Sequence, residues 1–122
     1  TGEVADLRAE VAHAKVALCG VPVVVGAQTK VLEAMACGTP VVTTPAGNFG
    51  IDGVDGRDLH VADSADRFAD RVADLLHGLH WQALSRAGRR LVEEQFAPAR
   101  AASELETVLS EAMRVHRSRG VA

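Results

Sequence analysis

The sequence is poor in aromatic residues: three Phe, one Trp and no Tyr occur among its 122 residues. Proteins that bind single-stranded nucleic acid stack the bases on aromatic side chains and follow the phosphates with a basic groove. A formal net charge of −3 offers no basic surface of that kind. The composition therefore argues against nucleic acid as a partner.

Cysteine is also scarce. Cys19 and Cys37 fit neither a metal-binding spacing nor a disulfide framework, so we expect two small buried residues in a reducing compartment. No apolar run approaches the ~20 residues of a membrane-spanning helix, and no signal peptide is visible. We expect a cytoplasmic protein. A weak peripheral contact with an acidic membrane surface, through the basic residues of 114–119, is the alternative location.

Several ligand-binding motifs are incomplete. The glycines of 20–26 have the spacing of a P-loop, but Ala27 stands where that motif requires lysine. No Gly-x-Gly-x-x-Gly run indicates a nicotinamide cofactor. The glycine-rich segment 50–58 lacks the closing Glu of a calcium loop, and we expect a flexible turn there. His77 and His80 have no third ligand nearby and indicate a polar interhelical loop. The sequence thus indicates no metal ion and no cofactor.

The chain nevertheless has enough apolar residues, 48% of the total, to form the core of one domain. Apolar and β-branched runs predict three strands, at Val16–Cys19, Val41–Thr44 and Leu59–Ala62. Helical periodicity predicts five helices. They lie near Leu7–Ala14, at Lys30–Cys37, after Ser64 with Phe68, Val72, Leu75 and Leu76 buried, near Leu84–Phe96, and from Pro98 onward. Alternating strands and helices predict an α/β fold with a parallel sheet and crossover helices.

The most informative stretch runs from Gly26 to Thr44 as loop, helix, turn and strand. The predicted helix Lys30–Cys37 is followed by Gly38, which we expect to close it with positive φ. Pro40 then prevents the helix from resuming. The apolar face of this helix is expected to comprise Val31, Leu32, Met35 and Ala36.

Glu33 is the polar residue that departs from this pattern. It lies just behind a glycine-containing loop that opens a helix, where unpaired amides and the helix dipole bind anions. A phosphate at the loop and a ribose at the Glu33 carboxylate would together hold a nucleotide. Lys30 would add a compact cation for a diphosphate, or would form an i, i+3 ion pair with Glu33. A surface Glu stabilised by the helix dipole remains the alternative for Glu33.

The run KVLEAMACGTPVVTTPAGNFGI, from Lys30 to Ile51, resembles the signature of the retaining glycosyltransferases of family 4. The similarity continues through the loop 50–58 and the later segment AGRRLVEEQFAPARAASELE. It implies the C-terminal half of a two-domain, Rossmann-like (GT-B) fold. It also implies that Glu33 binds the ribose of a nucleotide-diphosphate sugar. The residues implied to hold the diphosphate are Gly26, Ala27, Gln28, Thr29 and Lys30.

The function that this resemblance implies is sugar transfer from a nucleotide-diphosphate donor to an acceptor of unknown identity, in carbohydrate biosynthesis. Many members carry a second Glu eight residues before the first, but Val25 occupies that position here. The catalytic residues are unknown, and by resemblance a basic pair lies upstream. The competing interpretation is a non-catalytic α/β module that binds a nucleotide or a protein. A buried Glu33 and Gly26 loop would favour that module, and an open cleft would favour the transferase.

Three strands are few for a doubly wound domain, and the chain opens without a strand of its own. We therefore expect 1–122 to be one partial nucleotide-sugar-binding domain whose N-terminal part is missing. The helix in 99–122 is expected near the domain boundary. The open sheet edge beside Val16–Cys19 and the apolar stripe of this helix are expected to promote self-association.

Overall fold

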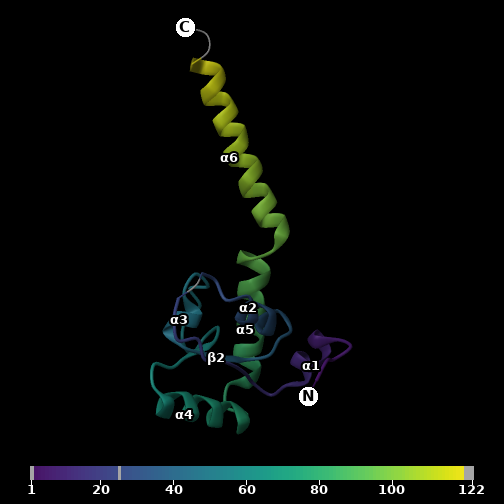
Figure 1. Cartoon of the computed structure of the whole chain (residues 1–122), viewed down its shortest axis with the longest axis vertical. Coiled ribbons are helices and arrows are strands. Elements are labelled where there is room, and N and C mark those ends of the chain that lie inside the picture. The colour runs from purple at the N-terminus through teal and green to yellow at the C-terminus, as the bar shows by residue number, and fades with distance from the viewer. Residues whose placement is uncertain (1, 25, 120–122) are drawn as a thin grey trace.

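The computed structural model describes residues 2–24 and 26–119, and it has an α/β fold. Three parallel strands form one sheet in the order β1-β2-β3: β1 (Ala17–Cys19), β2 (Val41–Thr43) and β3 (His60–Val61). The helices of the described residues are α1 (Leu7–His13), α2 (Thr29–Ala36), α3 (Pro45–Asn48), α4 (Ala65–Leu76), α5 (Trp81–Gln95) and α6 (Pro98–Arg119). Figure 1 shows a compact body from which α6 extends as a long free helix. The predicted fold class is confirmed.

The strands are shorter than predicted. β1 pairs with β2 through Ala17 and Val41, and β2 pairs with β3 through Thr43 and Val61. All three residues of β2 are buried, as expected for a central strand covered on both faces. The predicted strand Leu59–Ala62 shrinks to His60–Val61 because Leu59 forms an isolated bridge with Asp55 instead.

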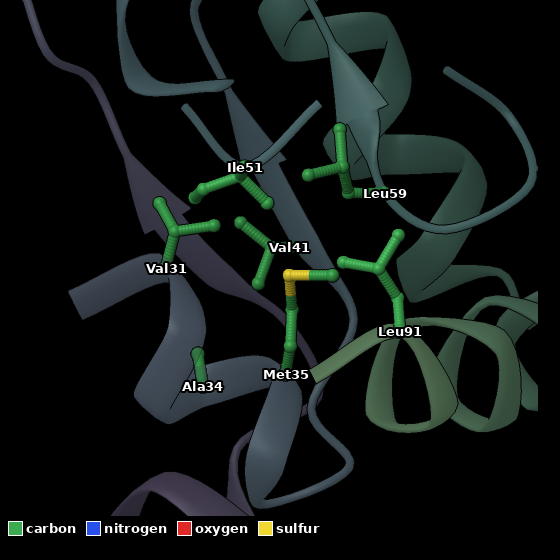
Figure 2. Packing of buried hydrophobic residues seen from close by; sticks show 7 residues of the cluster. All are labelled: Val31, Ala34, Met35, Val41, Ile51, Leu59 and Leu91. Atoms are coloured by element: carbon green, nitrogen blue, oxygen red, sulfur yellow. The ribbon is translucent and has the colours of Figure 1, made fainter. Parts of the chain in front are cut away.

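One face of the sheet is covered by α2 and α5. Figure 2 shows seven buried side chains that point toward one another from the sheet, both helices and the loop after α3. They are Val31, Ala34, Met35, Val41, Ile51, Leu59 and Leu91. In this core Met35 lies between the sheet and α5, which explains its 1% exposure.

The opposite face is covered by α4 and the start of α5. Its buried core consists of Val42, Ala62, Leu75 and Leu84. Trp81 packs against this cluster, and its ring N–H donates to the Lys15 carbonyl at 2.5 Å. This hydrogen bond joins the first residue of α5 to the segment that precedes β1.

Two predicted helix faces need correction. On α2 the buried residues are Val31, Ala34 and Met35, whereas Ala36 is exposed, because α2 packs against both the sheet and α5. On α4 Leu75 is buried but Leu76 is 53% exposed. The sheet lies on one side of α4, so one of two adjacent leucines must point away from it.

Turns connect the elements largely as predicted. Gly38 has φ of +78° after α2, which confirms the expected left-handed helix end. His77 and His80 lie in the turn between α4 and α5. The short helix α3 was not predicted: Thr44 caps it by accepting the Gly47 N–H at 3.2 Å, and Pro45 begins it. A Thr-Pro pair before small residues was the available signal.

The segment 50–58, predicted as a flexible turn, is an irregular loop held by side-chain hydrogen bonds. The Asn48 side chain makes two hydrogen bonds with the Gly53 backbone, at 2.9 and 3.1 Å. Asp58 is 3% exposed and accepts from the Val54 N–H and from Arg57. These contacts fix the path of the chain from α3 to β3.

Candidate functional site

The candidate site lies where the carboxyl ends of the parallel strands meet. The loop 20–28 leaves the end of β1, Thr44 follows β2, and Ala62 follows β3. In open α/β sheets, ligands bind in the crevice beyond this edge. The first turn of α2 is at the same edge, because the loop 20–28 leads directly into it.

The amino end of α2 lacks a side-chain cap. Gln28 is the N-cap residue, but its side chain accepts no backbone hydrogen bond there and instead donates to the Gly26 carbonyl at 3.3 Å. The Val31 N–H donates to the Gln28 carbonyl at 3.0 Å, which leaves the Thr29 and Lys30 amides as the first-turn donors for which helix geometry provides no acceptor. Gly26 has φ of +87°, a conformation that suits glycine. The loop therefore presents backbone donors and the positive end of the helix dipole to solvent.

The loop 20–28 contacts two other segments, the residue that follows β2 and the turn that follows α3. The Thr44 hydroxyl donates to the Val21 carbonyl at 2.5 Å. A Cβ atom at Gly50, whose φ is +73°, would lie 3.5 Å from the Ala27 nitrogen. The turn after α3 thus packs closely against the predicted phosphate loop, a contact that no sequence motif indicated.

Lys30 is exposed in the first turn of α2. Burial raises the pKa of the Cys19 thiol, and the Lys30 ammonium opposes that increase, which places this cation near the carboxyl end of β1. No ion pair joins Lys30 to Glu33 or to any other described residue. The alternative of an i, i+3 pair is therefore not realised.

Glu33 is also exposed, one turn behind the loop. Its side chain lines a groove of about 200 Å³ between α1 and α2, which we call the α1–α2 groove. The other lining residues are Leu7, Arg8, Val11, Ala36 and Cys37. The groove is mainly apolar, with Arg8 and Glu33 as its charged residues. Periodicity predicted α1 as a helix but provided no signal that it would lie beside Glu33.

Most of the predicted site residues are exposed to solvent. Gly26, Ala27, Thr29, Lys30 and Glu33 are exposed, and Gln28 is half-buried. Val25, the position of the second family Glu, lies outside the described residues. Cys19 and Cys37 are free thiols and half-buried rather than fully buried.

A cluster of charged and titratable side chains lies between β3, the loop 50–58 and α4. Buried His60 places its Nδ1 at 3.4 Å from Asp55 Oδ1, and Arg71 lies 3.6 Å from the other Asp55 oxygen. Burial and the Arg71 charge lower the pKa of His60. Partial burial acts to raise the pKa of Asp55, but bonds from the Val61 N–H and His60 hold it below its usual value. The cluster joins the loop 50–58 to α4 and contains no nucleophile.

The described residues contain no group of three or more His, Cys, Asp and Glu side chains able to hold a metal ion. Within the same part of the chain, no helix combines the length and apolar character needed to cross a membrane.

Comparison with known protein families places this α/β domain in one of them. Residues 1–78 match the family described as glycosyl transferases, group 1. The chain belongs to this family. Glycosyl transfer is accordingly its role at the family level. The matched region includes the loop, α2, all three strands and α4, and hence every candidate site residue. Searches of curated proteins and of solved structures found no match.

Proposed function

We propose that this chain binds the nucleotide-diphosphate sugar used as donor by a group 1 glycosyltransferase. The loop Gly26–Thr29 and Lys30 would hold the diphosphate, and Glu33 would accept hydrogen bonds from the ribose hydroxyls. The observation that carries the proposal is the uncapped amino end of α2 at the carboxyl edge of the sheet, with an unpaired carboxylate one turn behind it.

The distances within the helix suit this assignment. Thr29 and Glu33 are four residues apart, so about 6 Å of helix axis separates the amide end from the carboxylate. A ribose is joined directly to the first phosphate, so one ligand could reach both places. Exposure of the loop and of Glu33 favours the donor site over a non-catalytic module in which these groups would be buried.

The α1–α2 groove would receive the nucleoside end of the donor. Leu7 and Val11 offer apolar surface for a flat ring, and Arg8 provides a planar cation that can stack on a base. Lys30 lies on the diphosphate side of Glu33. The donor would therefore run from the groove, past Glu33, to the loop.

For the whole protein we propose a retaining transferase of family 4 with the two-domain GT-B fold. Catalysis would be electrostatic stabilisation of the leaving diphosphate by cations. The basic pair expected from the family resemblance would come from another part of the protein. We accordingly expect the 122-residue chain to bind the donor but not to transfer the sugar.

Two open surfaces fit the proposal that a further part of the same protein completes the domain. β1 is an edge strand, and its Leu18 is 58% exposed. Beside Leu18 lies an apolar groove of about 600 Å³, lined also by Thr44, Ala62, Phe68 and Val72. In parallel sheets both faces are normally covered, so another strand beside β1 and a helix over Leu18 would fill these places.

The test is calorimetric titration of the protein from its full open reading frame with uridine, guanosine and adenosine diphosphate sugars. Glu33→Ala should weaken binding of the preferred donor about 5- to 150-fold, which corresponds to about 1–3 kcal/mol. Glu33→Gln, which keeps one acceptor but loses the charge, should fall between Ala and the parent.

Glu10→Ala is the matched control, because Glu10 is an exposed carboxylate on α1 that does not line the groove. It should leave donor affinity unchanged. Unchanged affinity in Glu33→Ala would remove Glu33 from the site. Failure of the parent protein to bind any of the three donors would contradict the proposed function itself.

A further inference from the structure

The residue that follows β2 is bonded to the start of the loop 20–28. The Thr44 hydroxyl donates to the Val21 carbonyl at 2.5 Å and accepts the Gly47 N–H at 3.2 Å. Among the described residues, no other hydrogen bond joins this loop to a segment other than α2. A single half-buried hydroxyl therefore links the loop to α3, and it uses its donor and one of its acceptor positions to do so.

The turn after α3 contacts the other end of the same loop. A Cβ atom at Gly50 would lie 3.5 Å from the Ala27 nitrogen and 3.6 Å from the Ala27 Cα and Cβ atoms. This turn is joined to the following residues by the two hydrogen bonds between the Asn48 side chain and the Gly53 backbone. The segment 44–50 thus contacts the loop near its start and near its end.

The strands hold α3 in place. The Thr43 hydroxyl donates to the Cys19 carbonyl at 2.8 Å, across the pairing of β1 and β2. Gly47 is buried against this bond: a Cβ atom there would overlap with Thr43 Oγ1 and would lie 3.4 Å from the Cys19 carbonyl oxygen. Because residue 47 has no side chain, α3 lies directly on the ends of the two strands. Thr44 therefore attaches the loop to a support that is fixed to the sheet.

We propose that Thr44 is a positioning residue of the donor site. Its hydroxyl holds the loop 20–28 in the conformation that presents the Thr29 and Lys30 amides to the diphosphate. Thr44 acts through the loop and not by contact with the donor. A loop that is already ordered loses less conformational entropy when the ligand binds, so the affinity is higher. This inference rests on the proposed function.

The experiment is calorimetric titration of the protein from its full open reading frame with uridine, guanosine and adenosine diphosphate. Thr44→Ala should weaken binding of the preferred diphosphate about three- to tenfold, the loss expected for one hydrogen bond that orders the loop. Thr44→Ser keeps the hydroxyl and should bind within about twofold of the parent. Both variants lack the Thr44 methyl group, so the difference between them isolates the hydroxyl.

Ser85→Ala is the matched control. The Ser85 hydroxyl is half-buried like that of Thr44, and it also donates to the carbonyl of a distant residue, Gly38, at 2.6 Å. This bond lies at the opposite end of α2 from the loop. Ser85→Ala should lower the melting temperature but leave the diphosphate affinity within about twofold of the parent. A role of Thr44 in stability alone would give this same result for Thr44→Ala.

A pair of glycine variants tests the other end of the loop. Gly50 and Gly56 have similar φ values, +73° and +77°, so valine strains the backbone at both. At Gly50 the new side chain would meet Ala27, whereas no described atom lies within 4 Å of the Cβ position at Gly56. Gly50→Val should weaken diphosphate binding about three- to tenfold, and Gly56→Val should weaken it less than about twofold.

Hydrogen exchange of the ligand-free protein measures the order of the loop itself. Thr44→Ala should raise the exchange rate of the amides of residues 26–30 and leave that of α5 unchanged, and Thr44→Ser should restore slow exchange. This readout separates a positioning role from a direct contact with the donor, which would leave the loop amides of the ligand-free protein unaffected.

Two results would overturn the positioning role while donor binding stands. The first is a parent affinity in Thr44→Ala, with Glu33→Ala still weakened. The second is weakened binding in Thr44→Ala with unchanged exchange of the loop amides, which would assign Thr44 a direct contact with the ligand. Failure of the parent to bind any of the three diphosphates would instead contradict the proposed function, and the positioning role would fall with it.

Discussion

The helices α5 and α6 follow each other directly and both are amphipathic, but only α5 buries its apolar face in this structure. α5 buries Leu84, Gly88 and Leu91 against the body, whereas every described side chain of α6 is exposed. Their apolar stripes look alike in the sequence. The difference teaches that helical periodicity identifies the face that needs a partner and does not identify the partner.

Close contacts explain why α5 is held. A Cβ atom at Gly88 would lie 2.7 Å from the Asp58 carbonyl oxygen and 3.4 Å from the end of Met35, so glycine lets the helix approach both. The Ser85 hydroxyl donates to the Gly38 carbonyl at 2.6 Å, which joins α5 to the end of α2. α6 is joined to α5 near its first turn, where Arg100 donates to the Glu94 carbonyl at 3.1 Å, and from there it extends away from the body in Figure 1.

The largest expected effect on stability is the loss of a buried leucine from α5, compared with the loss of an exposed leucine from α6. Leu84→Ala should lower the free energy of unfolding by about 2–5 kcal/mol, because Leu84 is 1% exposed and its removal leaves a cavity. Leu105→Ala, at a residue 60% exposed, should change it by no more than about 0.5 kcal/mol. Urea denaturation at a concentration low enough to keep the chain monomeric measures both. Equal losses would mean that α6 packs on the body in solution.

A smaller effect is expected at the junction between α2 and α5. Gly38→Val should destabilise the chain by about 1–3 kcal/mol, because a β-branched residue is strained at φ of +78°. Its side chain would also meet Ser85, whose Oγ lies 3.4 Å from the Cβ position. Gly20→Val is the control, since Gly20 has no positive φ and no atom near its Cβ position. Thermal melts of the two variants should differ clearly, and equal melting temperatures would contradict the prediction.

The smallest expected effect is a dependence of the unfolding free energy on pH. The titrating groups responsible lie in the body of the molecule and not in α6. Because burial and Arg71 lower the pKa of His60, the unfolded chain binds a proton at higher pH than the folded chain. The folded state should therefore lose stability as pH falls below about 6.5. The pKa of Asp58 is also lowered: burial opposes the shift, but bonds from Arg57 and Val54 prevail. With Asp55, it should cause a second loss as pH falls through their folded pKa values.

Urea midpoints measured at about pH 7.5 and pH 5.5 test the first of these losses. The parent should be less stable at the lower pH, and His60→Gln, which does not titrate, should show a shallower decrease. The other four histidines are exposed and are the same in the parent and in His60→Gln. An identical decrease in the parent and in His60→Gln would exclude His60 as the cause.

Much of the fold could be predicted because its signals are local. The Gly38 turn and the buried strand β2 depend on neighbouring residues, and the structure contains both of them. The position of Glu33 behind the loop was also visible as spacing. By contrast, the groove beside Glu33 needs α1, whose Leu7 and Val11 are more than twenty residues away in the chain. The same holds for the contact between Gly50 and Ala27.

The sequence by itself determined the α/β class, the order of the elements and the loop-helix unit with its carboxylate, because backbone preferences and hydrophobic periodicity act over a few residues. Only the tertiary structure decided which surfaces meet: α5 covers the sheet and α6 does not, α1 lines a groove with Glu33, and His60 is buried beside Asp55. The physical reason is that burial depends on contacts between distant segments, and an amphipathic pattern is the same whether its apolar face is covered or open.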